Sequence, residues 1–233
     1  MNAKITELVF ILDRSGSMGG LEGDTIGGFN GMIDKQRKDI KKRGDHNERV
    51  NITTVLFDDQ VEVIHDRFDI AIVEPLTDDD YYVRGCTALL DAVGSTILKV
   101  SNIQKRLPED MRAGKVIFVI TTDGHENSSR EYSYSQIKSM IEQKKEEGWE
   151  FLFLGANIDA GKEAEKIGIA RNRSVTYEND SKGVELNYEA VGSAIRKAVA
   201  MDADEALFED DWQEEIAEYH QKSVSRRKKR RNA

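Results

Sequence analysis

The sequence predicts an α/β fold: a doubly wound, mostly parallel six-stranded sheet with one antiparallel edge strand and helices on both faces. Two observations predict it. Short aliphatic runs alternate along the chain with longer segments in which apolar residues recur at helical spacing. Two of these runs, residues 8–12 and 116–120, are apolar without alternation and soon meet an aspartate, as strands do in a parallel sheet covered on both faces.

The first half of the chain is predicted to form a strand, a helix and a hairpin. The strand at residues 8–12 precedes an amphipathic helix that stops at Gly44 and whose inward positions are Ile26, Phe29, Ile33 and Ile40. Residues 50–57 and 61–64 are expected to pair as a hairpin, because only three polar residues separate them. This hairpin supplies the antiparallel edge. Residues 66–85 show no sustained period, and we interpret them as a surface connection with room for one short helix.

Strands and helices continue to alternate in the second half. We expect helices at residues 89–100, 135–147, 159–166 and 184–199, and strands at 115–122, 149–155 and 174–176. Beyond Met201 the composition shifts sharply to dense acids and then to a basic run. The domain boundary is therefore placed there, with one domain at residues 1–201 and a tail at 202–233.

The tail is predicted to consist of an acidic amphipathic segment and a disordered basic end. Phe208, Trp212 and Ile216 fall at helical spacing among acids, which favours docking on the same domain over binding a partner. Residues 226–231, from Arg226 to Arg231, are six adjacent cations that repel one another, which favours disorder. Any binding of nucleic acid is expected to reside in this basic end.

Composition narrows the classes of function. The chain has 34 basic and 43 acidic residues and a net charge of −9, which argues against a general binder of nucleic acid or membrane surfaces. A single cysteine cannot form an internal disulfide, so we expect a reducing, cytoplasmic location. The opening residues lack the apolar core of a signal peptide, and no apolar run reaches membrane-spanning length, so no membrane partner is expected.

Acidic and hydroxyl side chains follow several of the predicted strands. Asp13, Ser15 and Ser17 come directly after the first strand, Thr87 precedes a helix, and Asp123 ends a later strand. The ligand crevice of an open α/β sheet lies beyond the carboxyl ends of its strands. Each residue also has an ordinary explanation, since Ser and Thr cap helices and Asp begins turns. Taken together, two carboxylates and three hydroxyls are a donor set suited to a hard cation.

The spacing of these residues resembles the von Willebrand factor type A (VWA) family, whose fold is Rossmann-like. Its metal-ion-dependent adhesion site (MIDAS) combines D-x-S-x-S with a distant threonine and a distant aspartate. The resemblance covers roughly the first 200 residues. It implies metal ligands at Asp13, Ser15, Ser17, Thr87 and Asp123.

The resemblance implies a binding module and not an enzyme. A magnesium or manganese ion, with calcium as the third candidate, would dock an Asp or Glu of a partner protein. Cys86 departs from the glycine of many members, and we expect its side chain to pack. One alternative is a metal-dependent phosphohydrolase, although Ser15 stands where such enzymes carry a second acid. The other is a nucleic-acid-associated accessory protein acting through residues 226–231.

Overall fold

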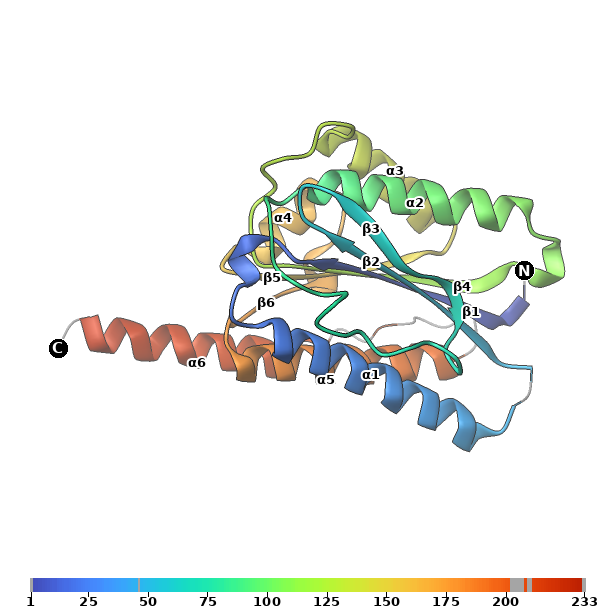
Figure 1. The fold of residues 1–233 in the computed structure, drawn as a ribbon, viewed down its shortest axis with the longest axis horizontal. Coiled ribbons are helices and arrows are strands. Elements are labelled where there is room, and N and C mark those ends of the chain that lie inside the picture. Colours follow the sequence, from blue (N-terminus) through green and yellow to red (C-terminus); the bar gives the residue numbers. More distant parts are fainter. Residues whose placement is uncertain (1, 46, 202–207, 209–210, 232–233) are drawn as a thin grey trace.

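The fold is a six-stranded sheet between two layers of helices (Figure 1). The computed structural model describes residues 2–45, 47–201, 208 and 211–231. The strand order is β3-β2-β1-β4-β5-β6, and every neighbouring pair is parallel except β2 and β3. The predicted doubly wound sheet with one antiparallel edge strand is confirmed.

The elements match the predicted order. The strands are β1 (Asn2–Asp13), β2 (Arg49–Phe57), β3 (Val61–Asp69), β4 (Ala113–Thr122), β5 (Glu150–Ala156) and β6 (Ser174–Tyr177). The helices are α1 (Glu22–Arg43), α2 (Leu89–Arg106), α3 (Tyr134–Glu146), α4 (Ala160–Lys166), α5 (Ser181–Ala200) and α6 (Glu214–Arg231). Short 3-10 turns are η1 (Gly16–Met18), η2 (Glu109–Met111) and η3 (Arg171–Arg173).

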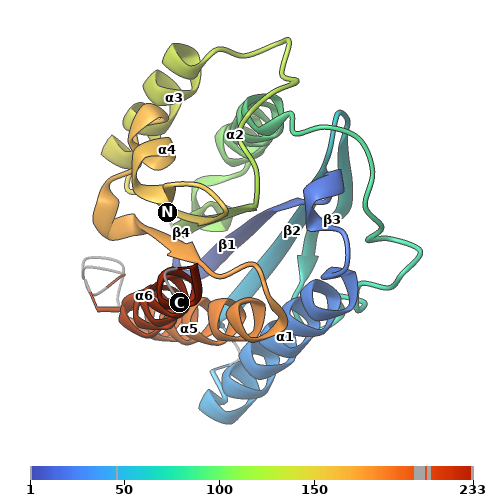
Figure 2. The same ribbon diagram turned by 90° about the vertical axis from the view of Figure 1, so that its left-hand side faces the viewer.

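Both faces of the sheet are buried. Helices α1, α5 and α6 cover one face, and α2, α3 and α4 cover the other (Figure 2). Along β1, Leu8 and Phe10 belong to the core on the α1 side, while Val9 and Ile11 belong to the core on the α2 side. This is why the strand is apolar at successive positions instead of alternating.

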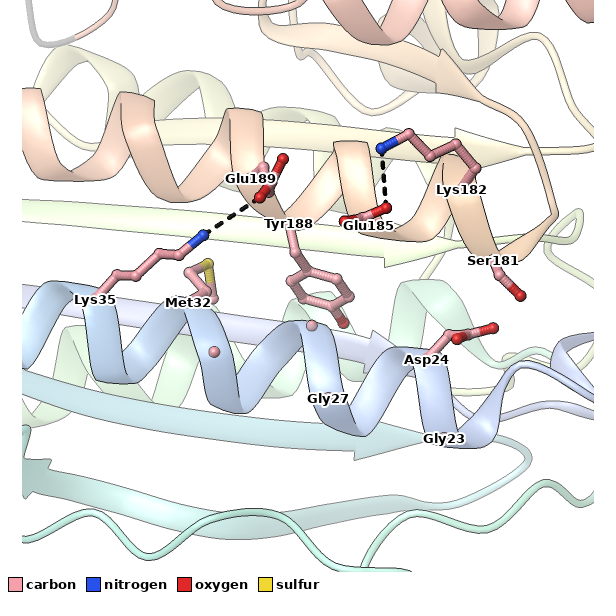
Figure 3. A pocket seen from close by; sticks show the side chains of 12 residues that line it. Gly23, Asp24, Gly27, Met32, Lys35, Ser181, Lys182, Glu185, Tyr188 and Glu189 are labelled. Atoms are coloured by element: carbon pink, nitrogen blue, oxygen red, sulfur yellow. Dashed lines mark hydrogen bonds and ion pairs between the residues drawn. The ribbon is translucent and has the colours of Figure 1, made fainter.

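Helices α1 and α5 meet at a glycine. The ring of Tyr188 on α5 lies against Gly28 on α1, where an added Cβ would come 2.3 Å from the ring atom Cδ2. Figure 3 shows Tyr188 reaching across to α1 beside Gly27, next to a groove of about 520 Å³. Any larger residue at Gly28 would push the two helices apart.

The connection after the hairpin differs from the prediction. Strand β3 continues to Asp69, and residues 70–88 contain no helix. This connection is also more than a surface loop, because Ile70, Val73 and Leu76 are buried in the core. Polar residues of α1 bind its backbone: Arg37 donates to the carbonyls of residues 70 and 73, and Asn30 exchanges two hydrogen bonds with residue 76. Hydrogen bonds to α1 thus hold this connection in place, although its sequence has no helical period.

The tail packs on the sheet, although less regularly than predicted. Phe208, Trp212 and Ile216 are all buried in the core on the α1 side. Only Ile216 lies in a helix, since α6 begins at Glu214. Residues 202–207 and 209–210, most of the predicted acidic segment, lie outside the described residues. Helix α6 continues to Arg231, so the basic end is helical where disorder was predicted. The first half of α6 packs on the core, and the basic residues that follow continue the same helix.

None of the described helices is long and apolar enough to span a membrane.

Candidate functional site

Two of the predicted site residues end adjacent parallel strands. Asp13 is the last residue of β1, and Asp123 directly follows β4. The register aligns Leu12 with Thr121, which brings Asp13 beside Thr122. There the Thr122 hydroxyl donates to Asp13 Oδ2 at 2.6 Å. Parallel pairing of β1 and β4 therefore places both carboxyl groups at one edge of the sheet.

The loop after β1 links these carboxylates through its serines. The backbone N–H of Ser15 donates to Asp13 Oδ1 at 2.7 Å. The hydroxyls of Ser15 and Ser17 lie 3.1 Å apart, and the Ser17 hydroxyl donates to Asp123 Oδ1 at 2.5 Å. Neither serine caps a helix with its side chain. Four of the five predicted residues thus form one continuous chain of polar contacts.

Thr87 completes the group. Its backbone is held by Asn127, whose side-chain oxygen accepts from Thr87 N at 2.9 Å. Ala88, not Thr87, is the N-cap of α2, so the hydroxyl of Thr87 does no capping. An added Cβ on Gly124 would lie 3.4 Å from Thr87 Oγ1 and 3.5 Å from Ser17 Oγ. Gly124 therefore lies against both hydroxyls, which brings Thr87 next to Ser17.

Burial dominates the electrostatics of the site. Asp13 is 1% exposed, and this burial raises its pKa from 3.8 to about 6, although hydrogen bonds from Thr122 and Ser15 oppose the shift. Burial also raises the pKa of Asp123, against hydrogen bonds from Ser17 and Asn179. In the described part of the chain, no Lys, Arg or His forms an ion pair with either carboxylate. A cation between them would favour the ionised form of both.

The donor set fits a hard divalent cation. It offers two carboxylates and three hydroxyls, and Mg²⁺, Mn²⁺ and Ca²⁺ all prefer oxygen ligands. Within the described ranges, no three His, Cys, Asp or Glu side chains cluster as a metal site. Any cation at this edge of the sheet would therefore rely on the hydroxyls of Ser15, Ser17 and Thr87 as well as the two carboxylates.

No protein-family model and no curated protein matches the sequence. Solved structures do match. The mussel byssus protein PTMP1 (proximal thread matrix protein 1) is 16% identical, with a TM-score of 0.52, over 81% of this chain and 45% of its own. The pilus adhesin SpaC from Lactobacillus rhamnosus GG is 14% identical, with a TM-score of 0.57, over 84% of this chain and 31% of its own.

A third match covers an isolated domain. The vWF domain of the pilus tip protein Mfa5 from Porphyromonas gingivalis is 10% identical, with a TM-score of 0.53, over 86% of this chain and 98% of its own. The chain has a VWA-like fold. At these identities the likeness concerns the fold alone, and this VWA-like chain spans less than half the length of the mussel protein.

Sequence reasoning missed the carboxylate that braces the site of this VWA-like domain. Asp58 is fully buried and accepts from Arg14 Nε at 2.9 Å and from Arg84 Nε at 2.6 Å. Its backbone carbonyl accepts from Ala88 N at 2.8 Å. The sequence assigned Asp58 to a turn, and it does also bind Gln60 N in that turn. Arg14, the cation inside the D-x-S-x-S motif, is fully buried against this acid, and no local pattern in the sequence indicates that contact.

Two further residues form hydrogen bonds with the aspartates of the VWA-like site. The hydroxyl of Tyr81 donates to the backbone carbonyl of Asp13 at 2.5 Å, and Asn179 Nδ2 lies 3.4 Å from Asp123 Oδ2. Neither belongs to the motif, so the spacing could not indicate them. The expectation that Cys86 packs is wrong, because its side chain is exposed. It protrudes from a loop in which Gly85 adopts a left-handed φ of 66°.

Proposed function

We propose that this VWA-like domain binds a partner protein through a divalent cation held by Asp13, Ser15, Ser17, Thr87 and Asp123. One observation carries the proposal: side chains from three separate segments meet at one edge of the sheet without satisfying one another's charge. The two carboxylates are joined through serine hydroxyls and lack a protein cation among the described residues. A buried carboxylate in that state is costly unless a cation reaches it.

The chemistry of the ligand set supports a partner's carboxylate as the remaining ligand. Magnesium and manganese favour six oxygen ligands, and five protein positions leave a place for one from outside. Asp or Glu is the hard anionic donor that a protein can supply. Calcium remains the third candidate. A solved structure of mussel PTMP1 is described as having a zinc-occupied MIDAS motif, which supports a divalent ion at the corresponding edge of this fold.

A binding role is favoured over turnover. Ser15 occupies the position where a phosphohydrolase would need a second acid, so a general acid is lacking there. Pilus adhesins and a byssus matrix protein share the fold, which supports a module that binds other proteins. We also propose a cytoplasmic location, on the basis of the single cysteine.

Calorimetric titration of chelator-treated protein with magnesium or manganese tests the cation site. We expect the wild type to bind, and Asp13→Ala and Thr87→Ala to weaken binding at least tenfold, by about 1.4 kcal/mol or more. Glu189→Ala is the matched control, since Glu189 is exposed on α5 and, among the residues that the structure describes, forms an ion pair with Lys35 alone, across the groove. Equal affinity in all four proteins would refute the site.

Affinity purification from the source cells tests the partner. A protein retained by the wild type in magnesium should be lost on chelation and absent with Asp13→Ala. The same preparations should show no turnover of phosphate esters. A partner that ignores both chelator and Asp13→Ala would contradict the metal-bridged mechanism.

A further inference from the structure

Helix α6 has two sides with different surroundings. One side faces a cavity of about 530 Å³ between α6 and α4, which His220, Val224 and Arg227 line from the helix. On that side Arg227 forms an ion pair with Glu178, which directly follows β6. Residues three and four positions apart share one face of a helix, so these three residues mark the side of α6 that packs toward the domain.

The opposite side of α6 carries a row of exposed cations. Lys222, Arg226 and Lys229 follow one another at intervals of four and three residues, and none of them lines the cavity. Lys222 pairs with Glu218 of the same helix at 2.9 Å, and exposed pairs of this kind stabilise a protein only weakly. Among the residues that the structure describes, Arg226 and Lys229 have no acidic partner. We call these three cations the cationic stripe.

The end of α6 holds its positive charge apart from the acids of the protein. Glu218 is the last Asp or Glu of the chain, and the thirteen residues from Tyr219 to Arg231 include seven cations. Figure 1 shows that the end of α6 projects beyond the carboxyl ends of the strands, away from the rest of the domain. The net charge of the whole chain is nevertheless −9, so a basic helix projects from an acidic body.

The projection is long enough to separate the two charges electrostatically. An α-helix rises about 1.5 Å per residue, so residues 222–231 extend about 15 Å along the axis. At about 0.1 M ionic strength, interactions between exposed charges are largely screened beyond about 10 Å. A polyanion near the end of α6 is therefore attracted by these cations more strongly than it is repelled by the acids of the domain.

We propose that the projecting end of α6 is a second binding face, for the phosphate backbone of a DNA duplex, and that it acts independently of the cation site. Lys222, Arg226 and Lys229 each contact a phosphate. Successive cations of the stripe lie about 4.5–6 Å apart along the helix axis. Each DNA strand carries a phosphate about every 3.4 Å along the duplex axis, so the three cations meet different phosphates.

The dimensions of an α-helix favour DNA over an RNA duplex. An α-helix with its side chains is about 10–12 Å across, and the major groove of B-form DNA is about 12 Å wide. The helix can therefore lie along this groove with phosphates on either side. The Arg227 side chain is 61% exposed although it is paired, which adds a cation on the side away from the stripe. The major groove of an RNA duplex is too deep and narrow to admit such a helix.

The same segment lacks the features of a membrane-binding helix. Helices that lie in a membrane interface carry an apolar face opposite their cations. From Lys222 to Arg231 the sequence has one apolar residue, Val224, and it lines the cavity. A flat anionic membrane would also come close to the acidic domain, whereas a DNA duplex can cross the projecting helix at a distance from it.

Fluorescence anisotropy with a labelled DNA duplex tests the proposal on the full chain. The test variant combines Lys222→Gln, Arg226→Gln and Lys229→Gln, and Gln has a helix propensity close to that of Lys and Arg. In low salt we expect the wild type to bind in the micromolar range and the variant to bind at least about tenfold more weakly. The slope of log affinity against log salt should become shallower by about 2–3, since each lost phosphate contact reduces it by about 1.

The matched control combines Lys38→Gln, Lys41→Gln and Lys42→Gln. It removes three exposed cations near the end of α1, where Lys42 pairs with Asp39 of its own helix, as Lys222 pairs within α6. That end of α1 lies at the opposite edge of the sheet (Figure 1). The control should keep the affinity and the salt slope of the wild type. An equal loss in both triple variants would mean a general charge effect and would overturn the proposal.

Further arms separate this inference from the proposed function and from other ligands. DNA binding should survive chelator and Asp13→Ala, and its loss in either would place DNA at the cation site and overturn the proposal. Failure of the wild type to bind DNA in low salt would overturn it as well. An RNA duplex of the same sequence and vesicles that contain phosphatidylserine should bind more weakly, and a preference for either would assign α6 to that ligand instead. Loss of the cation site in calorimetry, with DNA binding intact, would refute the proposed function alone.

Discussion

Two buried carboxylates on one strand have opposite surroundings. Glu7 and Asp13 both lie on β1, and each is 1% exposed. Glu7 Oε1 accepts from Arg67 Nη2 at 2.6 Å, from Asn51 at 2.9 Å and from Gln104 at 3.2 Å. From the described residues, Asp13 accepts hydrogen bonds only from the Thr122 hydroxyl and from backbone and side-chain groups of its own loop.

Under the proposed function, this difference separates a structural carboxylate, Glu7, from a metal-binding one, Asp13. Arg67 neutralises the charge of Glu7 inside the protein, so this part of β1 needs no further counter-ion. Asp13 has hydrogen-bond donors but no protein cation among the described residues, and burial raises its pKa to about 6. The carboxyl end of the strand therefore keeps a charge that an outside cation can neutralise. Burial alone does not mark a site, whereas burial without a counter-charge does.

Removing the structural carboxylate should have the largest effect on stability. Glu7→Ala leaves Arg67 without its counter-ion and two amides without their acceptor, so we expect the free energy of unfolding to fall by about 3 kcal/mol. Because the Arg67 side chain is 22% exposed, the loss should lie at the low end for buried pairs. Urea denaturation measures it, and cation affinity should not change. A loss below about 1 kcal/mol would show that Glu7 is not held by its ion pair.

Neutralising Asp13, the proposed metal ligand, should raise the free energy of unfolding instead of lowering it. In chelator at pH 7.5, Asp13→Asn should be about 2 kcal/mol more stable than the wild type, since a shift from 3.8 to about 6 corresponds to nearly 3 kcal/mol. The amide can still accept from Ser15 N and donate to Thr122. Magnesium should then stabilise only the wild type.

The pH dependence of that difference has a fixed sign. The folded state holds the Asp13 proton more tightly than the unfolded state, so the wild type loses stability as pH rises from about 4 to about 6. The gain from Asp13→Asn should be near zero at pH 4 and complete above about pH 6.5. Thermal unfolding across this range in chelator measures it. A gain independent of pH would rule out Asp13 titration as its cause.

Removing one donor to Asp13 should have the smallest effect. Thr122→Val deletes the hydroxyl that donates to Asp13 Oδ2, and we expect a loss of about 1 kcal/mol at pH 7.5 in chelator. The loss should shrink at pH 4.5, because hydrogen bonds to an ionised carboxylate are stronger than those to a neutral one. Urea denaturation at both values tests this, and an unchanged loss would contradict it.

Local sequence patterns predicted the buried strands and the residues at their carboxyl ends. The apolar runs of β1 and β4 indicated buried parallel strands, and parallel strands place their final residues at one edge, so the meeting of Asp13 and Asp123 could be predicted. The contact of Arg14 with Asp58 could not, because it depends on how the β2–β3 turn folds back over the first loop.

The remaining differences have similar causes. Ile70 and Leu76 are buried, although the sequence around them shows no hydrophobic period. Arg37 and Asn30 hold this connecting segment by hydrogen bonds to its backbone, so it does not need to form a helix or a strand. The basic end was predicted to be disordered because its own residues only repel one another. Ile216, ten residues before Arg226, is buried and holds the start of α6 on the core, and the helix continues from there into the basic end. The adjacent charges of the basic end give no indication of that distant contact.

The position of Asp58 bears on how fast a cation can enter and leave. One carboxylate and its backbone carbonyl bind Arg14, Arg84 and Ala88, so the loop that carries Ser15 and the segment that carries Thr87 are tied together before any ion arrives. The arriving ion then has no loop to order. At the proposed site, we therefore expect the exchange of the ion's own hydration water to set its capture rate, and the strength of its contacts with the five oxygens to set its release rate.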